Sequence, residues 1–110
     1  MSEKLSAQTC IPCSIDTPPM SGEILYKLLN DLDSDWILID ELSLERVFKL
    51  KNFLLALEFV NKIGLLAESE GHHPDIELSY GKVKVKLITH KIKGLSRNDF
   101  ILAAKIDGIN

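Results

Sequence analysis

The sequence predicts an α+β fold in which a four-stranded antiparallel sheet carries helices on one face, in the order α-β-β-α-β-β-α. Two observations lead to this class. Segments with helical spacing of apolar residues alternate with pairs of segments in which apolar residues recur at every second position. The links inside each strand pair are of hairpin length, and hairpins join antiparallel strands. Helices that bury the apolar face of such a sheet complete the layered arrangement.

The composition is that of one ordinary globular domain. The chain has 110 residues, of which 45% are hydrophobic and 26% charged. Its net charge of −3 argues against nucleic-acid binding, which needs clustered Lys and Arg. No apolar run reaches the roughly 18 residues of a membrane span, and no signal-peptide pattern opens the chain, so we expect a cytoplasmic protein without a membrane partner.

Residues 1–20 read as a proline-broken, peripheral N-terminal tail, and residues 21–110 as the single domain. The tail holds both cysteines, as Cys10-Ile-Pro-Cys13. Three interpretations of this spacing stay open: inert thiols, an occasional disulfide, or half of a metal site. The first is favoured, because no second Cys pair completes a zinc site and no strand-to-helix junction surrounds the motif.

The first half of the domain predicts a helix and a hairpin. Ser21 is a candidate N-cap for a helix over 21–33, and strands are expected over 36–40 and 42–50 around a turn at Asp40-Glu41. Leu44, Phe48 and Leu50 share one face of the second strand with Arg46, an exception to the apolar pattern. Trp36, the only tryptophan, is interpreted as an aromatic anchor on the sheet in preference to a ligand-stacking residue.

Residues 52–68 form the strongest predicted helix, with Asn52 as its cap. Apolar side chains cover most of its circumference and leave a narrow polar strip. In so small a domain, such a helix is expected to bury one side against the sheet and another against a second subunit. The sequence therefore predicts a homo-oligomer, either a dimer or a tetramer.

The second half predicts another hairpin and a last helix. Strands are expected over 76–80 and 82–90, and alternation along an unbroken second strand would place His90 on its lysine face. The final helix is expected from Ser96 to about Asp107. Ser96 and Asp99 have capping-box spacing, which indicates a structural role for Asp99, and Leu95 and Phe100 fit a hydrophobic staple.

His72, His73 and His90, which are all the histidines of the chain, are the candidate catalytic residues. Imidazole titrates near pH 6.5 and can both give and take a proton near neutrality. Metal-free general acid–base catalysis suits three imidazoles best. Neighbouring histidines in an extended segment point apart, which argues against a zinc site. Both cysteines lie in the tail, which argues against a nucleophilic Cys-His pair. The structural alternative is that the histidines only make hydrogen bonds near a turn and have no chemical role.

One longer motif resembles a known family: Glu68-x3-His72-His73-Pro74-x5-Tyr80-x9-His90-x8-Asp99. It is similar to the signature of the pterin-4a-carbinolamine dehydratases, also called dimerisation cofactors of a homeodomain transcription factor. The likeness runs from about Trp36 to Ala104, and the Cys10-x2-Cys13 and Pro18-Pro19 leader is similar to that of bacterial members.

The resemblance implies dehydration of 4a-hydroxytetrahydropterin to quinonoid dihydropterin, the recycling step for tetrahydrobiopterin after aromatic amino-acid hydroxylation, without metal or other cofactor. It makes the three histidines the catalytic set. It also implies that Glu68 orients an imidazole and that Trp36 lies near the pocket. The residues implied to contact the pterin, largely through backbone groups, are Gly71, Ile88, Thr89 and Lys91.

Two positions depart from the family pattern. Gly71 and Lys91 stand where animal members carry acids, so side-chain contacts made by those acids are not expected here. The rival hypothesis is a non-catalytic protein that serves as a dimerisation partner of a transcription regulator. An intact set of three histidines favours catalysis over this rival.

Overall fold

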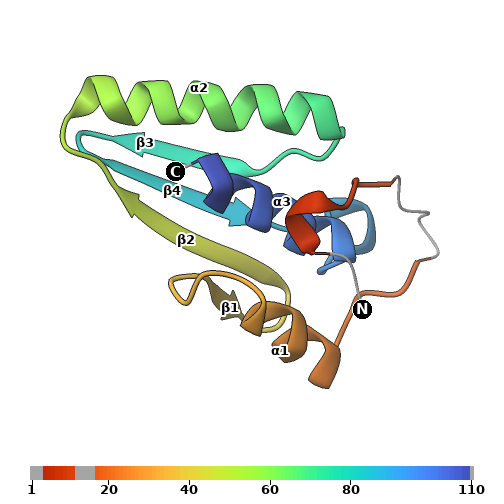
Figure 1. Ribbon diagram of the computed structural model, residues 1–110. Helices are drawn as coiled ribbons and strands as arrows, with labels where there is room; N and C mark the ends of the chain where they lie inside the picture. Colours follow the sequence, from red (N-terminus) through yellow and green to blue (C-terminus); the bar gives the residue numbers. More distant parts are fainter. Residues whose placement is uncertain (1–3, 12–16, 110) are drawn as a thin grey trace.

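The computed structural model describes residues 4–11 and 17–109 and shows the predicted α-β-β-α-β-β-α order (Figure 1). Two short 3₁₀ helices, η1 (Leu5–Ala7) and η2 (His90–Ile92), are added to it. The helices and strands are α1 (Glu23–Asn30), β1 (Ile37–Ile39), β2 (Ser43–Lys49), α2 (Phe53–Glu70), β3 (Asp75–Ser79), β4 (Lys82–Leu87) and α3 (Arg97–Ile109). The α+β class is confirmed.

The four strands form one antiparallel sheet in the spatial order β1-β2-β4-β3. The β1–β2 turn is the predicted one. Asp40 and Glu41 have φ values of 54° and 57°, and the Leu42 N–H donates to the Ile39 carbonyl at 2.9 Å. Positive φ at both central residues is the geometry of a type I′ turn, whose twist suits a hairpin.

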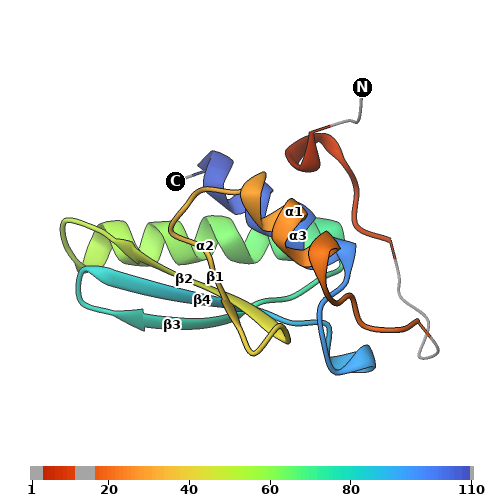
Figure 2. The same cartoon turned by 90° about the horizontal axis from the view of Figure 1, so that it is seen from below.

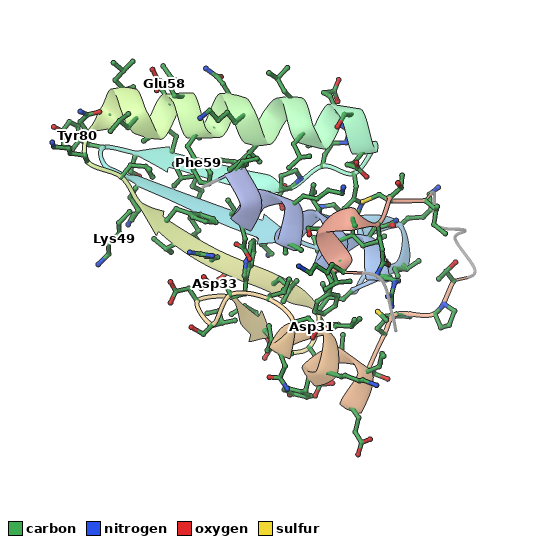
Figure 3. All side chains as sticks on the ribbon, viewed as in Figure 1. Asp31, Asp33, Lys49, Glu58, Phe59 and Tyr80 are labelled. Carbon is green, nitrogen blue, oxygen red and sulfur yellow. The ribbon has the colours of Figure 1, made fainter. Side chains whose placement is uncertain are left out.

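The helices cover one face of the sheet, as Figure 2 shows. Alternate residues of the two central strands are buried on that face: Leu44 and Phe48 of β2, and Val83, Val85 and Leu87 of β4. They pack in one core with residues such as Phe59 and Ile63 of α2 and Phe100, Leu102 and Ile106 of α3. Phe59 points from α2 toward the strands, whereas Glu58 points away from them (Figure 3). Apolar residues at every second position in the strands, and at helical spacing in the helices, therefore predicted the core correctly.

Arg46, the polar exception on the covered face of β2, is buried there because α3 supplies a partner. Its Nη1 lies 2.6 Å from Oδ1 of Asp107, and its guanidinium carbon lies 4.2 Å from the centre of the Phe48 ring. The same Asp107 carboxylate accepts a hydrogen bond from the indole N–H of Trp36 at 2.8 Å. Trp36 is 2% exposed and meets Phe48 edge-on. The aromatic-anchor interpretation of Trp36 is confirmed.

The caps that the sequence predicts at the helix N-termini are found in two of three cases. Asn52 caps α2, because its side chain accepts the Leu55 N–H at 2.9 Å. At α3, the Asp99 carboxylate reaches back to the Ser96 N–H at 2.9 Å, which is half of the predicted capping box. The expected cap at Ser21 is wrong: Gly22 precedes α1 with φ 73°, a value that glycine adopts easily, and no side chain caps the helix.

Residues 4–11 are not peripheral. We call residues 4–11 the N-terminal segment; within it Leu5 and Cys10 are buried members of the core. The expectation of a peripheral tail is therefore wrong for this segment, because η1 packs against α3. Cys13 lies outside the described residues, and the division into residues 1–20 and 21–110 stays a prediction.

Among the described residues, none of the helices combines the length and the apolar character that crossing a membrane requires.

Candidate active site

The three histidines lie at one end of the sheet, where α2 and β4 end and β3 begins. His72 and His73 follow α2 and lead into β3, and His90 follows β4. Because Asp75 pairs with Lys86, the start of β3 lies beside the end of β4. Tyr80, which belongs to the sequence motif, lies in the exposed β3–β4 turn at the opposite end of the hairpin (Figure 3).

Local backbone geometry sets the position of the histidine pair. Gly71 ends α2 in the left-handed region, with φ 67°, and its N–H donates to the Ala67 carbonyl at 2.9 Å. This is the usual way in which a glycine terminates a helix. A side chain would be strained at that φ, although the space around the α-carbon is open. Gly71 thereby turns the chain so that the next residues become extended.

The expectation that β4 runs unbroken to His90 is wrong. The strand ends at Leu87, and a bridge between Thr89 and Gly94 closes a loop that contains η2. The Thr89 N–H donates to the Gly94 carbonyl at 2.9 Å, so it pairs within this loop and not with a neighbouring strand. The position of His90 is therefore decided by the loop, and strand alternation does not apply to it.

A cavity of about 380 Å³ brings most of the predicted site residues together. Seven residues that the sequence indicated line it: Gly71, His72, His73, Ile88, Thr89, His90 and Lys91. Trp36 is not among the lining residues, so the structure does not bring it to this cavity as the resemblance implies. The indole is directed instead to Asp107 under the sheet.

His72 is held by a buried carboxylate. Its Nε2 lies 2.6 Å from Oδ1 of Asp99, which is fully buried. The other oxygen of Asp99, Oδ2, accepts the Thr89 hydroxyl at 2.7 Å and the Ser96 N–H at 2.9 Å. A carboxylate oxygen accepts hydrogen bonds, so we assign Nε2 of His72 as a donor. The structural role expected for Asp99 as a helix cap is thus only part of what it does, because the same carboxylate is the partner of a histidine that lines the cavity.

The other two histidines are exposed and pair with exposed acids. Nε2 of His73 contacts Oε2 of Glu68, the acid that the resemblance implies orients an imidazole. Nε2 of His90 lies 3.8 Å from Oδ2 of Asp75. His72 and His73 therefore turn to different partners, as expected for neighbours in an extended segment.

The cavity also has four lining residues that the sequence did not indicate: Cys10, Ile11, Glu70 and Asn98. They belong to the N-terminal segment and to the ends of α2 and α3 that face it. Burial, and then the neighbouring Glu70 carboxylate, raise the pKa of the Cys10 thiol from 9.0 to about 12. The thiol is therefore neutral near pH 7. Glu70 had a local signal, as an acid two residues before the histidine pair, and Cys10 was singled out only for its spacing from Cys13.

Within the described part of the chain, no three His, Cys, Asp or Glu side chains are arranged to hold a metal ion. Asp99, Glu68 and Asp75 each pair with a different imidazole. The arrangement offers proton donors and acceptors around one cavity, which is what general acid–base chemistry requires.

A family model described as pterin 4 alpha carbinolamine dehydratase matches residues 18–109. A relative from Alkaliphilus metalliredigens is 53% identical over 103 residues, which are 94% of this chain and 93% of the relative. A relative from Rubrobacter xylanophilus is 46% identical over 107 residues, covering 97% and 98% of the two chains. The names of both relatives provisionally assign them to the pterin-4-alpha-carbinolamine dehydratases.

A solved structure agrees with the sequence comparisons. The fold is similar to the crystal structure of a protein from Brucella melitensis described as a transcriptional coactivator/pterin dehydratase, with a TM-score of 0.77 and 32% identity. The match covers 83% of this chain and 97% of that one. On the family model, the identity of the relatives and the shared fold, this chain belongs to the pterin-4-alpha-carbinolamine dehydratase family.

Proposed function

We propose that this protein is a 4a-hydroxytetrahydrobiopterin dehydratase, which removes water from the 4a-carbinolamine and releases the quinonoid dihydropterin. The observation that carries the proposal is the convergence of His72, His73 and His90 on one cavity, with His72 fixed by the buried Asp99. Family membership supports the same activity. In this role the protein recycles tetrahydrobiopterin after aromatic amino-acid hydroxylation, in the cytoplasm.

The reaction needs two proton transfers. The C4a–O bond breaks, and because hydroxide is a poor leaving group, an acid must protonate the oxygen so that water departs. The neighbouring ring N–H loses its proton to a base, and the N–H electron pair becomes the second bond of the new C=N. One proton is taken up and one is released, so the two imidazoles together return to their original charge.

His72 is suited to the base. Oδ1 of Asp99 accepts a hydrogen bond from Nε2–H, so in the neutral ring the lone pair is on Nδ1, and the adjacent carboxylate stabilises the imidazolium that proton uptake creates. An exposed histidine is suited to the acid, because it can exchange its proton with solvent between turnovers. His73, beside Glu68, and His90, beside Asp75, are the two residues in this position, and the one that does not transfer the proton positions the substrate.

The remaining lining residues bind the ring. We assign contacts with the pterin to Gly71, Ile88, Thr89 and Lys91, made largely through the backbone. Thr89 is held in this lining from both sides, because its hydroxyl donates to Asp99 and its N–H donates to the Gly94 carbonyl. Neither the acid–base step nor ring binding calls for a metal ion or an organic cofactor.

We further propose that the protein acts as a homo-oligomer through α2. Apolar side chains on the outer flank of this helix are exposed, among them Leu54 at 61% and Leu65 at 74%. A second copy would remove this surface from water. The rival function, a dimerisation partner of a transcription regulator, has one observation in its favour: the structural relative is described as a coactivator as well as a dehydratase.

A turnover assay tests the dehydratase function. The 4a-carbinolamine is generated in situ by a hydroxylase, and formation of the quinonoid product is followed against the uncatalysed background. Acceleration that depends on protein concentration is the expected result. A rate equal to the background, from protein that is folded by circular dichroism, would leave the non-catalytic partner as the better hypothesis.

A further inference from the structure

One wall of the cavity comes from a part of the chain far from the histidines in sequence. Cys10 and Ile11, the last described residues of the N-terminal segment, line the cavity together with His72 and His90. In Figure 1 this segment, drawn in red, lies beside α3, with which η1 is in contact. The cavity is therefore bounded on one side by residues that the helices and strands do not supply.

Paired hydrogen bonds hold this wall in place. The Cys10 N–H donates to Oε1 of Glu70 at 2.9 Å, and the Ile11 N–H donates to Oδ1 of Asn98 at 2.9 Å. The side-chain amide of Asn98 donates in return to the Ile11 carbonyl. Asn98 is 5% exposed and holds both polar backbone groups of Ile11, so it fixes the position of that residue on the rim of the cavity.

The rest of the segment is anchored independently. Leu5 is buried in the core, Nζ of Lys105 donates to the Ser6 carbonyl at 3.0 Å, and Nε of Arg97 donates to Oε1 of Gln8 at 2.8 Å. These contacts all reach α3. The wall is thus a fixed part of the fold, continuous with the helix that carries Asp99.

The groups that this wall leaves available determine which part of a ligand it can contact. The backbone N–H groups of residues 10 and 11 and the Ile11 carbonyl are engaged by Glu70 and Asn98, and the Cys10 thiol is neutral. What remains for a ligand is mainly the Ile11 side chain, which is 69% exposed. An apolar wall fits the carbon substituent of a ligand better than a polar ring edge, because unpaired polar groups are costly to desolvate.

We propose that Ile11 is a specificity-determining residue that packs against the substituent on C6 of the pterin, and that Asn98 is the residue that positions it. The inference rests on the proposed dehydratase function, since it assumes a pterin whose C4a lies near the histidines. It extends that function by naming the part of the substrate that this wall recognises.

Two substrates that differ only at C6 test the proposal: the 4a-carbinolamines of tetrahydrobiopterin, with a dihydroxypropyl group, and of 6-methyltetrahydropterin. In Ile11→Ala, loss of the contact should raise KM for the larger substrate roughly 10-fold and change the smaller one less, with kcat preserved. Ile11→Trp, which narrows the cavity, should also disfavour the larger substrate. Thr9→Ala is the matched control, because Thr9 is exposed in the same segment and does not line the cavity.

Asn98→Ala should reproduce the KM effect of Ile11→Ala and its substrate dependence. A merely structural role would lower the melting temperature and leave the ratio of kcat/KM between the two substrates unchanged. If Asn98→Ala fails to fold, the Ile11 variants still decide the question.

The outcomes separate the two proposals. Wild-type protein that accelerates neither substrate would contradict the dehydratase function. Selectivity is then still measured by equilibrium binding of biopterin and 6-methylpterin, followed by the anisotropy of pterin fluorescence. If the Ile11 variants and Thr9→Ala show the wild-type ratio in both kinetics and binding, Ile11 is not a specificity residue.

Discussion

The Nε2 atom of His72 lies 2.6 Å from Oδ1 of Asp99, a fully buried carboxylate that is 27 positions further along the chain. This contact joins the end of α2 to the first turn of α3 and makes one residue both a helix cap and the partner of an imidazole that lines the cavity. Thr89, from the loop after β4, donates to the same carboxylate. Three elements are therefore tied together at the group on which the proposed chemistry depends.

Substitution of Asp99 by Asn should reduce both activity and stability. The amide cannot accept hydrogen bonds at both positions, so the Nε2–H of His72 or the donors from Thr89 and Ser96 lose their acceptor. Misorientation of His72 should lower kcat by about 10²-fold. Stopped-flow turnover together with thermal unfolding measures the two effects. Ser96→Ala is the control, because it removes a hydroxyl next to Thr89 and keeps the Asp99–His72 contact; its kcat should stay near that of the wild type.

Each single His→Ala change at His72, His73 and His90 should lower kcat/KM. A positioned general acid or base contributes about 10² to 10⁴ in rate. The double variant of the acid and the base should lose much less than the product of the two single losses, because the pair acts as a unit. Near-wild-type rates in all three single variants would show that the site is assigned wrongly.

Activity should survive chelation. Protein treated with EDTA and then dialysed should keep its rate, since proton transfer between imidazoles and substrate needs no Lewis acid. The measurement is turnover before and after treatment, with metal content determined by mass spectrometry. Loss of activity that zinc restores would show that a metal takes part in the reaction.

Leu57→Glu should break an oligomer formed through α2. Leu57 is 37% exposed on this helix, and a charge there would have to be desolvated in a subunit contact. Size-exclusion chromatography with light scattering should show a smaller species than the wild type. Asn61→Glu adds the same charge at an exposed polar position of α2 and is the control. A wild type that is already monomeric would refute the proposed contact.

The Cys10 thiol should resist alkylation in the folded protein. With a pKa of about 12 in place of 9.0, only about 10⁻⁴ of the thiol is ionised at pH 8, compared with about a tenth at the ordinary value. In a Cys13→Ser variant, which leaves Cys10 as the single thiol, iodoacetamide should therefore react at least about 10²-fold more slowly with folded than with urea-unfolded protein. Equal rates would contradict the buried, neutral thiol.

The raised pKa of Cys10 also makes the stability of the folded protein depend on pH. The folded protein holds the Cys10 proton more tightly than the unfolded chain does, so the contribution of this group is complete below about pH 9 and falls as the pH rises toward 12. Chemical denaturation of wild type and of Cys10→Ala across this range should show a steeper loss of stability in the wild type. Parallel curves would mean that the thiol ionises alike in both states.

The sequence by itself determined the elements and their buried faces. The apolar period distinguishes the strands around Leu44 and Val85 from α2, and the spacing of Asn52 and of Ser96 with Asp99 marks where two helices begin. It also determined the reactive residue types, because all three histidines lie in 19 consecutive positions, from 72 to 90. These properties depend on residues that are close together in the sequence, so a local pattern is enough to predict them.

Only the tertiary structure decided which side chains meet. Cys10 reaches Glu70 across 60 positions, Ile11 reaches Asn98 across 87, and Trp36 turns to Asp107 and away from the cavity. A period shows which face of an element is buried, but it carries no information about which distant residue lies opposite. The same reason explains the errors at β4 and at the N-terminal segment, where a loop closed by Thr89 and Gly94 and packing on α3 overrode the local pattern.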